Sequence, residues 1–282
     1  MSFLLGATVL CATLLAVNAS AWGRMGHATV VKIAQDHLTK KTAKKVNEIM
    51  HGQPLVAYAS YADEYRSDLD KAYSPAWAYG VPHAHTFEVD GEGQPFDTLF
   101  HPQTGRKITN AVYFADHCLQ ELARAKELTE QERWYALVMV AHLIGDIHCP
   151  AHVRYADKHD DIAKFPVVFK GVRDNYHHVW DEGMVVSVFP YSFSDIAEIC
   201  DDCSREGIEE ICRGNVYDWG AQVAKACRET RRSVKEGDSL DRVWARDHAE
   251  LSRTQLRNAG YRLAHALNMT FDPGYARKHG KR

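Results

Sequence analysis

The sequence lacks a strong excess of charge, an internal repeat and any low-complexity segment. Its 282 residues carry 34 basic and 37 acidic side chains, a formal net charge of −3. Proteins that bind by covering duplex phosphates are usually much more basic, so electrostatic coating of DNA is not expected. Hydrophobic residues make up 45% and charged residues 25% of the chain, which is ordinary for a soluble globular protein. This composition excludes a disordered chain, a collagen-like fibre and a polytopic membrane protein.

Long apolar runs are also scarce, and the one that stands out is at the start of the chain. Residues 1–21 are largely apolar and end in Ala-Ser-Ala, the small-x-small pattern that signal peptidase accepts, although no Lys or Arg lies near the start. We therefore expect a signal peptide over 1–21 and a secreted or periplasmic chain that begins at Trp22. A buried first helix is the alternative. No later stretch approaches the ~20 apolar residues of a membrane span.

Removal of this leader leaves an even number of cysteines. They are Cys118, Cys149, Cys200, Cys203, Cys212 and Cys227. An even number in an exported chain predicts disulfides, without indicating how they pair. The chain has no second Cys-x-x-Cys pair beside Cys200 and Cys203, so a zinc ribbon is the weaker interpretation. Asn268-Met269-Thr270 is a glycosylation sequon, which has meaning only in a eukaryotic secretory pathway.

Apolar spacing predicts a mainly helical mature chain. The expected helical segments are 30–38, 42–50, 107–127, 130–147, 205–234 and 239–268. The fourth is apolar on most sides, which is typical of a helix in the core. Strand signals are limited to Thr86–Val89 and Val167–Phe169, and long loops are expected over 90–105 and 157–175. We expect one all-α domain with very little strand over 22–282, ending in a short basic tail.

The most informative stretch is AHLIGDIHCPAH, residues 141–152. His142 and Asp146 are four residues apart, so they share one helix face and can bind a common metal ion. Their apolar surroundings matter because an unpaired carboxylate in a core is unfavourable. Pro150 ends the helix, and His152 projects from the turn beyond it.

A second stretch, NYHHVWD at residues 175–181, repeats the pattern with His177 and Asp181. A hydrogen bond inside a core explains either pair alone. Two such pairs beside His152 favour a metal site instead. Imidazole and carboxylate ligands without thiolate suit catalytic zinc with open positions.

The expected mature N-terminus supplies a third element, Trp22-Gly23-Arg24-Met25-Gly26-His27. A free α-amino group and its neighbouring carbonyl can form a five-membered chelate on a metal, which His27 would complete. Taken alone, an aromatic residue packed at the start of a chain is the simpler interpretation.

Together the three motifs resemble the secreted, zinc-dependent, single-strand-specific nucleases. This type I nuclease and 3′-nucleotidase family of moulds and plants is structurally related to zinc-dependent phospholipase C. The shared features are Trp followed by His five residues on, His-x3-Asp-x-His-x-Pro-x-His, and Asn-x-His-x-Val-Trp-Asp, in order across 22–181. The resemblance implies an all-α fold, three zinc ions in one cleft, and a monomer. It also implies hydrolysis of single-stranded DNA and RNA to 5′-nucleotides, with 3′-nucleotidase activity.

The resemblance further implies a role for individual residues. The first zinc takes Asp63, His85, His142 and Asp146; the second takes the Trp22 amino nitrogen and carbonyl oxygen, His27 and the bridging Asp146; the third takes His152, His177 and Asp181. Arg66 matches an arginine that contacts the scissile phosphate, so Asp63, Arg66 and Asp146 are the expected catalytic residues. His83 is the alternative to His85, because both lie in the same short extended segment.

Four positions depart from the family pattern and leave base preference open. Tyr61 replaces a Trp, Thr86 stands where an aromatic residue stacks on a base, Cys149 replaces a Gln, and 157–162 lacks the family's Gly-Gly-Asn. The extra imidazoles are His148, His159 and His178, which we expect to support ligands or face solvent. A phospholipase C on the same scaffold and a non-catalytic secreted zinc-binding protein are the alternatives, although Arg66 argues against the second.

Overall fold

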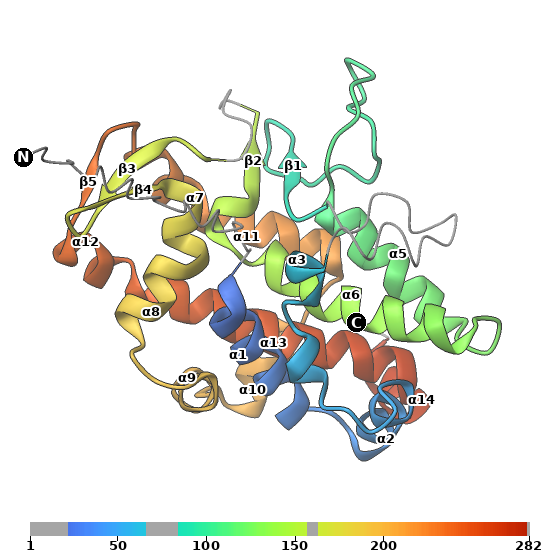
Figure 1. The fold of residues 1–282 in the computed structure, drawn as a ribbon. Helices are drawn as coiled ribbons and strands as arrows, with labels where there is room; N and C mark the ends of the chain where they lie inside the picture. Colours follow the sequence, from blue (N-terminus) through green and yellow to red (C-terminus); the bar gives the residue numbers. More distant parts are fainter. Residues whose placement is uncertain (1–21, 66–83, 157–162, 281–282) are drawn as a thin grey trace, which may run out of the picture.

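Helices form most of the molecule, which confirms the expected mainly helical fold (Figure 1). The structure, a computed structural model, describes residues 22–65, 84–156 and 163–280. The expected signal peptide therefore lies outside the described residues. Within the described part of the chain, no helix has the length and apolar character needed to cross a membrane.

In the first half, the helices that begin at Lys40, Ala111 and Glu130 start at side-chain caps supplied by Thr39, Asn110 and Thr129. The helices of this half are α1 (Gly23–Asp36), α2 (Lys40–Ile49), α3 (Tyr61–Glu64), α5 (Ala111–Ala123) and α6 (Glu130–Ile147), with a 3₁₀ turn at Leu55–Tyr58. Thr129 caps α6 in a reciprocal arrangement with Glu132, which satisfies amide groups that the first turn leaves unpaired. From Tyr135 to Ile147 every residue of α6 is buried, as its apolar pattern predicts.

The second half is more broken than predicted. Its helices are α7 (Tyr176–His178), a π-helical turn (Val179–Gly183), α8 (Met184–Val188), α9 (Phe193–Cys200), α10 (Arg205–Ile211), α11 (Val216–Ser233), α12 (Arg242–Asp247), α13 (Ala249–Phe271) and α14 (Pro273–His279). The single helix predicted over 205–234 is wrong, because Asn215 and Asp218 form a capping box that starts a new helix. The segment 239–268 likewise begins with a strand and divides at His248.

Two small sheets accompany the helices. In one, β1 (Phe87–Val89) runs parallel to β2 (Val153–Tyr155). In the other, β3 (Pro166–Phe169) pairs antiparallel with β4 (Val172–Asn175) and parallel with β5 (Ser239–Leu240). β1 and β3 confirm the strands predicted over Thr86–Val89 and Val167–Phe169, whereas β4 lies where only loop was expected within 157–175. Lys170 and Gly171 both have positive φ, 51° and 87°, which is the geometry of a two-residue hairpin turn.

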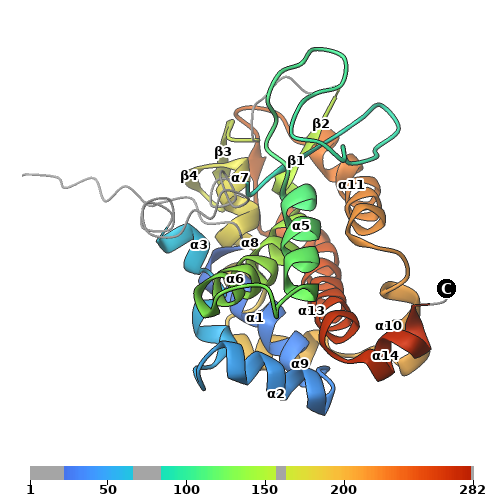
Figure 2. The same cartoon turned by 90° about the vertical axis from the view of Figure 1, so that its right-hand side faces the viewer.

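Three helices pack together at the centre of the fold: α1, α6 and α13 (Figure 2). Gly260 permits the close approach of α13 to α1, because a Cβ there would lie 2.5 Å from the Cβ of Ile33. On its other side α6 packs against α5, and α1 contacts the π-helical turn. This packing brings the start of α1 and the end of α6 toward the segment that carries His177 and Asp181.

The cysteines differ from expectation, and the asparagine of the sequon is buried. The six cysteines that the structure describes are free thiols, five of them buried, so the disulfide prediction is not supported. They lie on separate elements, and Cys212 donates instead to the Tyr261 carbonyl. Asn268 is 2% exposed, and its amide nitrogen donates to the His37 carbonyl while its oxygen accepts from the Thr39 amide. That buried amide is not available to carry a glycan.

Candidate metal centre

The last turns of α6 present His142 and Asp146 on one face, as their spacing predicts. Both are fully buried, and His142 Nε2 lies 3.2 Å from Asp146 Oδ2. His142 Nδ1 donates to the Ala59 carbonyl at 2.9 Å. That bond fixes the ring and its tautomer, so Nε2 carries the lone pair that a metal needs.

Asp146 is the meeting point of the site because its two oxygens face different partners. Oδ2 lies 2.9 Å from His85 Nδ1, on the side of His142. Oδ1 lies 3.3 Å from His27 Nε2 and 3.8 Å from His152 Nδ1. One carboxylate therefore lies within 4 Å of four histidines, His27, His85, His142 and His152, which come from four different segments of the chain.

Asp63 brings a second carboxylate to the same place from α3. Its Oδ1 lies 3.4 Å from His85 Nδ1, and its Oδ2 lies 3.7 Å from His142 Nε2 and 3.8 Å from His27 Nε2. The rings of His27 and His142 stack at a centroid distance of 4.1 Å. The structure thus brings the four residues predicted for the first zinc, together with His27, into one cluster.

A second cluster lies beside the first and contains His152, His177 and Asp181. Asp181 Oδ1 is 3.5 Å from His152 Nε2, and Asp181 Oδ2 is 3.1 Å from His177 Nε2. His152 ends a 3₁₀ turn (Pro150–His152), whereas Asp181 lies in the π-helical turn, a local distortion that often occurs at functional sites. These three residues are the predicted ligands of the third zinc.

Cys149 belongs to this second cluster, which the sequence analysis did not predict. Its sulfur is fully buried and donates to Asp181 Oδ1 at 3.2 Å, and the three side chains Cys149, His152 and Asp181 can hold one ion. Burial, with the charge of Asp181, raises the pKa of this thiol well above its ordinary value. The available signal was the unusual residue before Pro150.

Trp22 is fully buried at the start of α1, beside the first cluster's His27. Gly26 makes room for it, because a Cβ there would lie 2.9 Å from the Cβ of Trp22. Gly23 has a φ of +24° and approaches the Glu182 side chain so closely that a Cβ would lie 2.7 Å from its Cγ. The glycines of this motif therefore have a packing role, while metal binding by the Trp22 backbone remains a prediction.

Gly145 positions His27, and the sequence analysis missed it. A Cβ at Gly145 would lie 2.7 Å from Nδ1 and 3.0 Å from Cε1 of His27. Only glycine lets the His27 ring lie flat against α6 next to Asp146. The signal was a glycine inside a long apolar helix, directly before a predicted ligand.

The electrostatics of the first cluster favour a bound cation. Burial would raise the pKa of Asp146, but the charges of His142 and His85 hold it well below its usual range. Burial lowers the pKa of His142, yet the charges of Asp146 and Asp63 outweigh it and raise that pKa to about 9. Burial and His142 together lower the pKa of His27. Without a metal, the protonated imidazole of His142 must therefore balance buried carboxylate charge.

Several buried atoms of both clusters have no hydrogen-bond partner, which fits a metal. These atoms are both ring nitrogens of His27, both ring nitrogens of His152, Asp146 Oδ1 and Asp181 Oδ2. Buried polar atoms are nearly always satisfied, so a group of orphaned nitrogen and oxygen donors needs an explanation. Imidazole nitrogens with carboxylate oxygens are the donor set of catalytic zinc, and the residues present fit that ion.

Other predicted residues fall away from the clusters or outside the described part of the chain. Arg66, His83, His159 and the stretch 157–162 lie outside the described residues. Thr86 is buried and shares a 2.8 Å hydrogen bond with Thr109, and Phe87 is in the core. Neither side chain is exposed in a way that would let it stack on a nucleobase.

The two extra histidines that the structure describes act away from the metal positions. His148 donates from Nδ1 to the Ile144 carbonyl and accepts at Nε2 from Arg262, at 2.7 and 2.8 Å. Burial and the Arg262 charge lower its pKa well below the ordinary value. His178 pairs with Asp174 at 2.9 Å and with Glu182 at 3.6 Å, which raise its pKa to about 10.

Comparison with known proteins adds independent evidence. The family described as S1/P1 nuclease matches residues 22–272. The chain is 26% identical to Endonuclease 2 of Arabidopsis thaliana, over 91% of this chain and 92% of that protein. It is 28% identical to Nuclease S1 of Aspergillus oryzae over 80% of this chain and 73% of that protein. With Nuclease P1 of Penicillium citrinum it shares 27% identity over 58% of each.

Proposed function

Because the chain belongs to the S1/P1 nuclease family, a family of zinc-dependent phosphoric ester hydrolases, we propose that it cleaves single-stranded DNA and RNA to 5′-nucleotides and removes the phosphate of 3′-nucleotides. The observation that carries this proposal is the Asp146 carboxylate shared between the histidine groups. Adjacent metal positions bridged by one carboxylate suit phosphoryl displacement, where attacking and leaving oxygens need stabilisation at the same time.

We propose three zinc ions, held by the residues that the resemblance implies. The first position takes Asp63, His85, His142 and Asp146; the second takes Trp22, His27 and Asp146; the third takes His152, His177 and Asp181. The contacts support this set in its main feature, because Asp146 reaches His27 with one oxygen and His85 with the other. Bound zinc supplies a Lewis acid that polarises phosphoryl oxygens and makes water more acidic near neutral pH.

The protein itself contributes positioning, charge and a second buried carboxylate. The ring of His142 is fixed by the Ala59 carbonyl, and that of His27 by its fit against Gly145. The side chains of Asp63 and Asp146 are both buried, at 2% and 0% exposure. Asp146 lies between the histidines of neighbouring metal positions, so we assign it to hold those positions together, and we assign Asp63 to orient the attacking water and accept its proton. Arg66, by resemblance, stabilises charge on the phosphate.

The proposal extends to the form of the protein in the cell. A chain cut before Trp22 would act as a secreted or periplasmic monomer, with one catalytic domain over 22–282 that ends in a short basic tail. Its acidic balance suits single-stranded substrates, which local stacking and a metal cluster can hold without a broadly basic surface.

The decisive experiment assays the purified mature protein with zinc on four substrates in parallel. We expect hydrolysis of single-stranded DNA and of 3′-AMP, with little on duplex DNA and none on phosphatidylcholine. An Asp63→Asn variant should be inactive, and Asp174→Asn, which alters the similar His178 pair outside the clusters, should be active. Hydrolysis of phosphatidylcholine alone would establish the phospholipase alternative, and activity on none of the substrates would leave only metal binding.

A further inference from the structure

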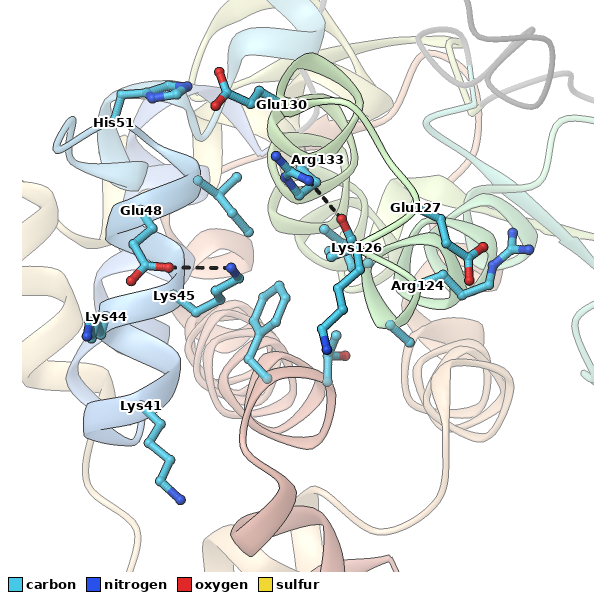
Figure 3. A pocket seen from close by; sticks show the side chains of 16 residues that line it. Lys41, Lys44, Lys45, Glu48, His51, Arg124, Lys126, Glu127, Glu130 and Arg133 are labelled. Carbon is cyan, nitrogen blue, oxygen red and sulfur yellow. Dashed lines mark hydrogen bonds and ion pairs between the residues drawn. The ribbon is translucent and has the colours of Figure 1, made fainter.

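A basic groove lies at the end of α6 opposite to the metal centre. It has a volume of about 850 Å³ and runs between α2, the turn that joins α5 to α6, and the end of α13 (Figure 3). Six basic side chains line it, against three carboxylates; the basic ones are Lys41, Lys44, Lys45, Arg124, Lys126 and Arg133, and the acidic ones are Glu48, Glu127 and Glu130. Lys45 and Lys126 reach into the groove from opposite sides. Phe271 adds an aromatic ring to the lining.

The positive charge of this groove is only partly neutralised. Lys45 pairs with Glu48 at 3.4 Å and Lys41 with Asp272 at 3.5 Å. Among the residues that the structure describes, no carboxylate forms an ion pair with Lys44, Lys126 or Arg133. An excess of positive charge in a chain whose net charge is −3 indicates a local anion-binding surface.

Arg133 combines a structural role with this charge. Its Nη1 donates to the carbonyls of Ala125 and Leu128 at 2.9 and 2.7 Å, which holds the turn between α5 and α6. Carbonyl partners leave the guanidinium charge uncompensated. Arg133 therefore holds the turn that lines the groove in place and also contributes a positive charge to the groove.

Aromatic rings lie between this groove and the metal centre. Trp134, next to Arg133 in α6, contacts the rings of Tyr58 and Tyr61 at 5.7 and 5.2 Å. Tyr61 stacks on Tyr65 at 4.5 Å, and these two tyrosines flank Asp63 in the chain. The Tyr65 ring is 44% exposed. An exposed ring beside the site and cations further along are the two features that hold single strands in proteins.

From these features we propose that the basic groove binds the phosphate backbone of a single-stranded nucleic acid whose scissile phosphate lies at the metal centre. This inference rests on the proposed function. At 1.5 Å rise per residue, Arg133 and Asp146 are about 20 Å apart along α6, or about six base steps at 3.4 Å. A polymer can therefore occupy both places, whereas a dinucleotide cannot. The groove thus favours long substrates over short ones.

The test compares a single-stranded 20-mer with a dinucleotide as substrates of the zinc-loaded enzyme. The variant is Lys44→Gln/Lys126→Gln, and the matched control is Lys225→Gln/Lys235→Gln, two exposed lysines of α11 and the segment that follows it. We expect kcat/KM on the 20-mer to fall about tenfold at low salt in the groove variant. The slope of log kcat/KM against log salt concentration should become shallower by about 1.4, because the variant loses two lysines and each single-strand phosphate contact contributes about 0.7 to that slope. Dinucleotide turnover and the control variant should match the wild type.

Each other outcome has a definite meaning. An unchanged rate and salt dependence on the 20-mer would contradict binding of the substrate by the groove. An equal loss of rate on the dinucleotide would contradict it as well. If the wild type cleaved neither substrate, the proposed function would fail. Binding of a fluorescent phosphorothioate 20-mer to the wild type and to the groove variant would then test separately whether the groove binds nucleic acid. Loss of binding to phosphatidylserine vesicles with unchanged 20-mer binding would instead identify a lipid surface and contradict the proposal.

Discussion

At the residue scale, the two oxygens of Asp146 lie between His85 on one side and His27 and His152 on the other. Asparagine at this position keeps the shape but removes the charge and one acceptor. We therefore expect Asp146→Asn to lose more than one zinc equivalent by elemental analysis and to lower activity by more than about a hundredfold. His152→Ala should lose about one equivalent. The Asp174→Asn control should retain full metal content, and full retention by Asp146→Asn would show that Asp146 does not bridge.

Gly145 gives a second residue-scale prediction. Its missing side chain accommodates the His27 ring, and the added methyl of alanine would displace that ring from Asp146. We expect Gly145→Ala to weaken binding of one zinc ion roughly 10- to 100-fold, as loss of a supporting partner does. A titration with a competing chelator measures this affinity. Gly207→Ala in α10 is the matched control, because its Cβ would make only ordinary contacts, the nearest at 3.5 Å. Equal zinc affinity in both variants would remove the positioning role of Gly145.

At the element scale, local spacing and caps account for what the sequence could predict. α6 was predictable because its apolar run is long and its N-cap is explicit. The break between α10 and α11 was not, since the apolar pattern continues across it while Asn215 imposes a cap. The strand over Val167–Phe169 was predicted, but its hairpin partner β4 was missed because the turn between them uses Lys170 with positive φ, a conformation that lysine rarely adopts.

In the candidate site too, the sequence predicted the residues placed by local spacing but not those placed by tertiary packing. The pairs His142/Asp146 and His177/Asp181 follow from helical spacing alone. The contact of Asp63 with His85 joins residues from α3 and from the segment before β1, which only tertiary packing brings together. Their assignment therefore needed the family resemblance. No spacing rule could place Cys149 beside Asp181 or reveal how closely His27 approaches α6.

The start of α1 leads to a prediction about chain processing. A free α-amino group has a reference pKa of about 7.7–8.0, and zinc can displace its last proton near neutral pH. An extra residue before Trp22 converts this amine into an amide, which is a poor ligand. We expect a protein that keeps one added residue to lose one zinc equivalent and most activity, although every side chain is intact. Equal zinc content and equal rates for the extended and trimmed forms would contradict the Trp22 chelate.

The interface of α13 with α14 gives a pH-dependent stability. Burial and the nearby His279 lower the pKa of His265 to about 4, and its Nδ1 accepts from the Tyr275 hydroxyl at 3.0 Å. The unfolded chain, with a histidine pKa of about 6.5, binds the proton more tightly than the folded protein. Stability from this group is therefore complete above about pH 6.5 and is lost as the pH falls toward 4.

Urea unfolding of wild type and His265→Gln at pH 7 and pH 4.5 measures this contribution. The difference in unfolding free energy between the two proteins should shrink at the lower pH by on the order of 1 kcal/mol, after discounting for screening at a half-buried position. Comparison of the two proteins cancels loss of zinc, which affects both. A pH-independent difference would show that His265 does not titrate in this range.

At the scale of the whole molecule, the fold surrounds a polar, charged centre with an apolar core. Helices α1, α6 and α13 bury the imidazoles and carboxylates of both clusters, while the exposed surface carries most of the remaining charge. Buried groups of this kind are unfavourable unless they are paired or bound to a metal. We therefore expect the core packing and bound zinc to stabilise each other, because the buried ligands need the metal and the metal needs ligands that only the folded chain brings together.

This dependence predicts that removal of zinc destabilises the entire protein. A ligand that binds only the folded state stabilises it by about 4 kcal/mol when its concentration is 1,000 times the Kd. For a chain of this size, about 1 kcal/mol shifts Tm by roughly 2–4 °C, so dialysis against a chelator should lower Tm by on the order of 10 °C. Calorimetry measures the change, and restored zinc should reverse it. Asp146→Asn, which already lacks the bridging ligand, should respond much less to the chelator. An unchanged Tm after verified removal of zinc would show that the buried clusters are satisfied without metal.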